Sequence, residues 1–131
     1  MGYYYQFKSK EIQLKKDTPK EIICFLDAFI NENNFDYPKP NHTLFTLEKW
    51  SSVLGKWAWY DKPFTFFNKD KLILFIWCDV KDGRNVIIEF ANWITPYVRG
   101  HKPKEYIGFI KGEDDREKTN LYIIRKTKPL S

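Results

Sequence analysis

The first segment of the chain alternates between apolar and polar side chains. Within residues 3–12, Tyr3, Tyr5 and Phe7 recur at every second position, although Tyr4 interrupts the alternation. The positions facing the other way carry Gln6, Lys8 and Lys10. Successive side chains of a strand point to opposite faces, so a period of two predicts a strand with one aromatic face.

Residues 17–34 carry the signals of an amphipathic helix. The tetrapeptide Thr18-Pro19-Lys20-Glu21 matches a capping box with proline at the first helical position, and Asp17 is a competing cap. Six apolar residues then repeat at intervals of three and four: Ile22, Ile23, Phe25, Leu26, Phe29 and Ile30. They form one stripe, which is the core-facing side of a helix. The asparagine-rich segment 31–34 is typical of a helix end.

The middle of the chain gives weaker patterns. Residues 35–45 contain Pro38 and Pro40 and are typical of an irregular loop. A short helix is predicted from Thr46 to Leu54, stopped by Gly55. The segment from Lys56 to Pro63 fits either a short strand or an aromatic-rich connection, because Trp57, Trp59 and Tyr60 suit both.

The second half predicts four strands and a helix. Residues 64–67 and 71–80 form a hairpin, and the second arm is apolar on both faces, as in a central strand. Residues 85–98 have the helical period, and Pro96 should loosen the last turn. Residues 105–111 and 119–126 complete the pattern as two further strands.

These elements predict a single α+β domain over residues 1–131. The order matches the ferredoxin-like β-α-β-β-α-β plan with an added C-terminal hairpin. We therefore expect an antiparallel sheet with two main helices packed on one face.

Two stretches resemble a family of small uncharacterised bacterial proteins. They are LKKDTPKEIICFL, residues 14–26, and VKDGRNVIIEFANWITPYV, residues 80–98. The shared features are a DTP…I helix start and a WI.PY helix end, covering about a third of the chain. The family brings no known activity, so the resemblance implies a fold and no site residues.

Composition narrows the function only slightly. With 22 basic and 17 acidic residues, the net charge is +5, which favours polyanions without naming a partner. The N-terminal residues lack a signal-peptide pattern, and no apolar run is long enough to span a bilayer, so we expect a cytoplasmic protein and no membrane partner. Aromatic residues make up 18% of the chain, more than a small core readily holds, which is an argument for a binding surface.

The candidate chemistry is sparse. Cys24, His42, Cys78 and His101 have no metal-ligand spacing, so we expect no metal and no cofactor. Ser51, Ser52 and Cys78 are candidate nucleophiles, but no nucleophile-elbow motif surrounds the serines, and a core strand would suppress the Cys78 thiolate. Asp79 and Asp82 are the nearest approach to paired carboxylates, and a solvated strand end explains them better. No catalytic residue is therefore assigned.

The remaining candidates are aromatic residues of the predicted sheet: Tyr3, Tyr5, Phe75 and Trp77. They favour a non-catalytic protein-interaction module, with a homodimer through the sheet as one form. The alternative is weak binding of single-stranded nucleic acid, since the RNA-recognition fold stacks bases on sheet aromatics. Against it, no Lys or Arg neighbours Phe75 and Trp77 in the sequence. A second alternative is an enzyme with an unrecognised site around Asp79, Asp82 and the segment 57–60.

Overall fold

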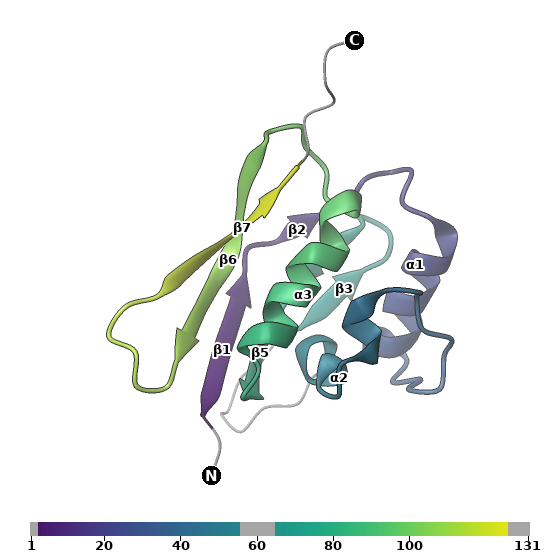
Figure 1. The fold of residues 1–131 in the computed structure, drawn as a ribbon. Coiled ribbons are helices and arrows are strands. Elements are labelled where there is room, and N and C mark those ends of the chain that lie inside the picture. The colour runs from purple at the N-terminus through teal and green to yellow at the C-terminus, as the bar shows by residue number, and fades with distance from the viewer. Residues whose placement is uncertain (1–2, 56–64, 126–131) are drawn as a thin grey trace.

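The computed structural model describes residues 3–55 and 65–125, which form two antiparallel sheets and a set of helices (Figure 1). The strands are β1 (Tyr4–Ser9), β2 (Ile12–Gln13), β3 (Phe66–Asn68), β4 (Ile73–Phe75), β5 (Trp77–Lys81), β6 (Lys104–Gly112) and β7 (Thr119–Ile124). The α-helices are α1 (Lys20–Leu26), α2 (Trp50–Leu54) and α3 (Arg84–Ile94). Shorter helical turns are the π-helix η1 (Asp27–Asn31) and the 3₁₀ helices η2 (Thr43–Thr46) and η3 (Thr95–Tyr97).

The centre of the fold is a bent antiparallel ribbon made by two segments far apart in the sequence. Strand β1 pairs with β5, and β2 pairs with β4. The ribbon changes sheets between Ser9 and Ile76. There the Ser9 N–H donates to the Ile76 carbonyl at 2.8 Å, and the Ile76 N–H donates to the Ser9 hydroxyl oxygen at 2.8 Å. The serine side chain thus replaces a backbone acceptor at the bend and keeps the two segments paired through it.

The ribbon divides the strands between the two sheets. The four-stranded sheet has the order β5-β1-β6-β7, and the three-stranded sheet has the order β2-β4-β3. Helix α3 connects β5 to β6 and lies across the four-stranded sheet, while α1 and α2 lie beside α3 (Figure 1). One face of the four-stranded sheet is therefore buried under helices. We call it the inner face, and the opposite one the outer face.

The core fills with alternate side chains of the strands and with the helix stripes. On the inner face, Phe7 is fully buried and its ring lies 5.9 Å from that of Phe90 in α3. Between the helices, aromatic rings pack on one another, and this cluster comprises Phe25, Phe29, Phe45, Trp50 and Trp93. Much of the high aromatic content is thus used in the interior.

The mixed α+β class is confirmed, but the strand order is not ferredoxin-like. The predicted strand over residues 3–12 is two strands in different sheets, and so is the predicted strand over residues 71–80. The predicted hairpin of 64–67 with 71–80 exists as β3–β4, in the smaller sheet. What remains of the expected plan is β5-α3-β6 with β1 between the two strands. The cause is the bend at Ser9, which depends on a long-range hydrogen bond that no local pattern reveals.

The predicted capping box is wrong. Helix α1 begins at Lys20 without a side-chain cap, because the Thr18 hydroxyl donates to the Lys15 carbonyl at 2.6 Å instead of accepting an N–H from the helix. The predicted end of this helix is confirmed, since Asn33 has a left-handed φ of 54°. The predicted helix from Thr46 to Leu54 is also shorter than expected. The backbone is extended at Leu47, after the 3₁₀ turn, and α2 begins only at Trp50.

The predictions for the C-terminal part of the chain agree more closely with the structure. The chain leaves the α-helix at Thr95 and forms a 3₁₀ turn around Pro96, as the proline predicts. Strands β6 and β7 cover the two predicted C-terminal strands within a few residues. No helix within the described ranges has the length and apolar character needed to cross a membrane.

Candidate binding surfaces on the four-stranded sheet

The four predicted binding residues do not share one surface. Tyr3 and Tyr5 lie together, with ring centroids 4.9 Å apart, and Tyr5 packs against the core on the inner face. Trp77 is on the outer face, because it pairs with Lys8 and alternates with buried Cys78. Phe75 belongs to the smaller sheet, where its ring stacks on Phe66 at 5.4 Å. The structure therefore brings Tyr3 and Tyr5 together and places them on the other face from Trp77, while Phe75 lies in the other sheet.

Trp77 begins a row of side chains that crosses the outer face. The strand register places Trp77 opposite Lys8, Lys8 opposite Phe109, and Phe109 opposite Asn120. The Lys8 Nζ lies 4.6 Å from the centroid of the Trp77 ring, and the Lys118 Nζ lies 4.3 Å from that of Phe109. Each ring in the row thus carries an ammonium group at cation–π distance.

A second aromatic group lies further along the same face, on β6 and β7. Tyr106 and Tyr122 are directly opposed, with ring centroids 5.9 Å apart, and each is 38% exposed. The Lys104 Nζ lies 4.5 Å from the centroid of the Tyr122 ring. Beside them Ile124, opposite Lys104, is 74% exposed, the highest value among the large apolar residues of the described chain.

Strand β7 is the edge of this sheet, and within the described residues no strand pairs with its outer side. Its sequence, TNLYII, contains neither a charged residue nor a proline. The N–H of Arg125, just after the strand, donates to the Pro103 carbonyl beside β6. Because N–H directions alternate along a strand, the amides of Asn120, Tyr122 and Ile124 point away from β6. Natural edge strands usually carry charge, proline or a cover, so this one is unusually open to pairing.

A shallow groove runs between this edge and helix α3. It has a volume of about 180 Å³ and is lined by Ala91, Asn92, Thr95, Tyr122, Ile123 and Ile124. A strand added beside β7 would lie along this groove, with alternate side chains directed toward the helix. The edge and the groove are therefore parts of one candidate site.

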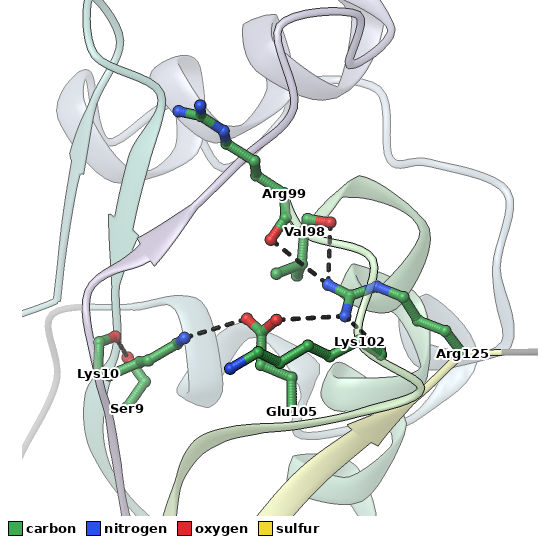
Figure 2. A network of polar contacts seen from close by, with 7 residues as sticks. All are labelled: Ser9, Lys10, Val98, Arg99, Lys102, Glu105 and Arg125. Atoms are coloured by element: carbon green, nitrogen blue, oxygen red, sulfur yellow. Dashed lines mark hydrogen bonds and ion pairs between the residues drawn. The ribbon is translucent and has the colours of Figure 1, made fainter.

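An ion-pair network holds the end of β7 in place (Figure 2). The Arg125 guanidinium donates to the Glu105 carboxylate at 3.2 Å and to the carbonyls of Val98 and Lys102 at 3.2 and 2.8 Å. Lys10 approaches the other Glu105 oxygen at 3.0 Å. Burial raises the pKa of Glu105, but the hydrogen bonds and charges of Lys10 and Arg125 outweigh it and hold that pKa below its ordinary value. The network ties β7 to β1 and to the turn after α3.

The predicted carboxylate pair does not form an active-site arrangement. The Asp82 carboxylate accepts the Tyr3 N–H at 3.0 Å, where it closes the end of the β1–β5 pair. Asp79 lies on the outer face opposite Gln6, and burial followed by the negative charge of Glu113 raises the pKa of Asp79. The segment 57–60, the third part of this prediction, lies outside the described residues.

Two other side chains with reactive chemistry, Cys78 and His42, take part in the fold itself. Cys78 is buried, and this burial raises the pKa of its thiol far above the ordinary value, as its place in a core strand predicts. The His42 Nδ1 accepts the Leu44 N–H at 3.0 Å and caps a helical turn. Across the described ranges, no three His, Cys, Asp or Glu side chains converge as metal ligands.

A larger pocket lies near the predicted serines. It has a volume of about 510 Å³, and its described lining consists of Phe29, Phe35, Lys39, Trp50, Ser51 and Ser52. Among these described lining residues, no histidine or carboxylate lies beside the serines, and the lining provides an apolar wall and one cation.

The C-terminal hairpin holds most of the outer-face aromatics, and the sequence reasoning missed them. The sequence patterns predict strands around Phe109 and Tyr122 but do not assign either residue to a face of the sheet. The period of two in residues 119–124 places Asn120, Tyr122 and Ile124 together, which was a usable signal. The β-bulge between Tyr106 and Gly108 hid the same signal in β6, because it shifts the alternation there by one residue.

Comparisons of the chain with protein-family models, with curated proteins and with solved structures found no match. The resemblance of residues 14–26 and 80–98 to a bacterial family stays a prediction.

Proposed function

We propose that the protein is a non-catalytic interaction module, and that a second copy of the chain pairs with it at the outer edge of β7. The observation that carries this proposal is the edge itself, a six-residue strand without charge or proline, ending in the exposed side chain of Ile124. Such an edge presents a row of unpaired N–H and C=O groups, which a further strand satisfies. The homodimer expected from the sequence is thereby moved from the sheet face to its edge.

The strand is complementary to itself. In an antiparallel pair centred on Tyr122, that residue faces its own copy, Leu121 faces Ile123, and Asn120 faces Ile124. Thr119 would face Arg125, so the described part of the strand places no like charges opposite each other. The outward amides of Asn120, Tyr122 and Ile124 then exchange about six hydrogen bonds with the partner. Between residues 119–125 of the two copies, charge repulsion, the usual protection against such pairing, is therefore absent.

The groove beside α3 adds apolar contact to this pairing. Across the two-fold axis, Leu121 and Ile123 of the second copy lie on the side of the sheet that faces α3, next to Ala91 and Thr95. Edge pairing of this length buries an area at the small end of specific interfaces, so we expect a dimer with a micromolar dissociation constant.

Sedimentation velocity over a range of about 5 to 500 μM tests the proposal, since a micromolar dimer dissociates within that range. We expect the sedimentation coefficient to rise with concentration for the natural chain. The substitution Asn120→Pro removes an outward N–H and leaves the bonds to β6 intact, so it should give a folded monomer. Ile124→Lys should do the same by adding charge to the edge.

Asn41→Lys is the matched control, because it adds the same charge at an exposed position in the loop before α2. It should dimerise like the natural chain. A natural chain that stays monomeric at about 500 μM would refute the proposal. Dimers of unchanged strength in Asn120→Pro and Ile124→Lys would place the interface elsewhere and refute it equally.

A further inference from the structure

We propose that the outer face of the four-stranded sheet binds single-stranded nucleic acid, by stacking bases on its aromatic rings and pairing phosphates with its lysines. The inference concerns the outer face of the sheet, whereas the proposed dimer uses the β7 edge, and the two surfaces meet at Tyr122. It is carried by the three rings that each hold an ammonium group within 4.6 Å, namely Trp77, Phe109 and Tyr122. The sequence reasoning had disfavoured this ligand because Trp77 has no basic neighbour along the chain.

The basic neighbours come from other strands. Lys8 of β1 lies between Trp77 of β5 and Phe109 of β6 in the strand register. Neighbouring strands are about 4.8 Å apart, so the two rings are separated by about 10 Å with one lysine between them. Rings and cations therefore alternate across the face, which is the arrangement that a chain of bases and phosphates requires.

The charge on this face is positive although the hairpin loop is acidic. Lys8, Lys104 and Lys111 project from β1 and β6, and Lys118 directly precedes β7. Asp79 and Glu113 are the acidic residues near them. Of the other acids of the loop, Asp115 is turned to the inner side, where its carboxylate accepts the Gly112 N–H at 2.7 Å and the Tyr3 hydroxyl at 3.2 Å.

The same features select single strands over duplexes. An aromatic ring reaches the face of a base only when that base is unpaired, whereas a duplex offers the sheet its phosphates alone. In the free protein the ammonium groups lie over the rings. On binding, the phosphates would draw them away, and the bases would take their place on the rings.

Fluorescence anisotropy with labelled oligo(dT) and oligo(U) of about 12 nucleotides tests the proposal at low salt. The triple variant Lys8→Gln, Lys104→Gln and Lys118→Gln should bind at least ~10-fold more weakly, and the slope of log affinity against log salt should fall by about 2. Tyr122→Leu keeps an apolar side chain without the aromatic ring, and should weaken binding by ~5-fold or more.

The matched control is the triple variant Lys16→Gln, Lys20→Gln and Lys71→Gln, which changes the charge equally at exposed positions away from this face. It should bind within about 2-fold of the natural chain. Four results would overturn the proposal: no binding at about 100 μM protein and low salt, equal binding of a duplex of the same length, equal loss in both triple variants, or unchanged affinity in Tyr122→Leu.

Sedimentation of the same samples separates this proposal from the dimer. If oligonucleotides fail to bind while the face variants alter dimerisation, the outer face is a protein contact and the nucleic-acid proposal is wrong. If Asn120→Pro is monomeric and still binds the oligonucleotides, both proposals stand, because binding then does not depend on the dimer.

Discussion

The two faces of the four-stranded sheet are built from the same strands and differ in almost every respect. On the inner face, Phe7, Cys78, Val80 and Ile110 are at most 2% exposed and pack under α3. On the outer face, the alternate positions carry Trp77, Lys8 and Phe109, all of intermediate exposure. Side chains alternate along a strand, so neighbouring residues of one segment serve the two purposes separately.

This difference indicates which residues of the sheet contribute to stability and which contribute to binding. Inner-face residues bury apolar area against a helix, which is the dominant favourable contribution to folding. Outer-face rings are covered by lysine side chains, whose stems hide apolar area while their ammonium groups stay in water. Substitutions on the inner face should therefore lower the free energy of unfolding, and those on the outer face should change binding instead.

The largest effect is expected from Phe7→Ala. Removing a fully buried ring that contacts Phe90 leaves a cavity and should lower the free energy of unfolding by about 3 to 5 kcal/mol. Phe109→Ala is the matched substitution on the outer face and should cost less than about 1 kcal/mol. Urea unfolding followed by far-ultraviolet circular dichroism measures both, and equal losses would remove the distinction between the two faces.

A smaller loss of unfolding free energy is expected at Glu105, which links the β6–β7 hairpin to Lys10 at the end of β1. Glu105→Gln leaves the Arg125 guanidinium, with its Val98 and Lys102 contacts, without its charged partner, and should cost about 1 to 3 kcal/mol at pH 7. The pKa of Glu105 is lowered in the fold, so its contribution is present above the ordinary value of 4.5 and is lost as the pH falls through the folded pKa.

The difference in free energy of unfolding between the natural chain and Glu105→Gln should therefore shrink below about pH 4.5. Lys69→Gln is a control, because its ion pair with Asp27 spans 3.5 Å at an exposed site and should contribute less than about 0.5 kcal/mol. A difference that is constant from pH 7 to about pH 3 would show that the Glu105 charge contributes nothing.

The smallest effect, of opposite sign, is expected from Asp79→Asn. Burial and the charge of Glu113 raise the pKa of Asp79, so the ionised form is disfavoured in the fold. Removing the charge should stabilise the protein slightly at pH 7, by about 0.3 kcal/mol, since Asp79 is only partly buried and water screens it. This gain in stability should vanish as the pH falls through the folded pKa of Asp79. Thermal unfolding at several pH values measures it, and a variant less stable than the natural chain at pH 7 would contradict the prediction.

The sequence predicts the elements of this fold better than their arrangement. The period of two located β6 and β7, and the proline at position 96 located the end of α3. The split of residues 3–12 into two strands was not predictable, because it depends on the pairing of Ser9 with Ile76, which lies 67 residues further along the chain. The failed cap at Thr18 has a similar origin, since a nearby carbonyl competes successfully for its hydroxyl.

The candidate site shows the same limit. That Trp77 lies in a strand followed from the sequence, but the lysine beside its ring comes from β1 and could not be assigned without the strand register. Residue type alone groups Tyr3, Tyr5 and Phe75 with Trp77. The alternation of β1 turns Tyr3 and Tyr5 to the inner face, and the bend of the central ribbon places Phe75 in the other sheet. The location of β7 at an edge likewise follows only from the strand order.

Hydrogen exchange at the amides of β7 tests the proposed pairing most directly. The N–H groups of Leu121 and Ile123 point toward β6, and those of Asn120, Tyr122 and Ile124 point outward. We predict that Leu121 and Ile123 are protected at every protein concentration, and that the three outward amides become protected only as the concentration rises through the dissociation constant. Outward amides that exchange equally fast in dilute and concentrated samples would contradict a dimer formed through β7.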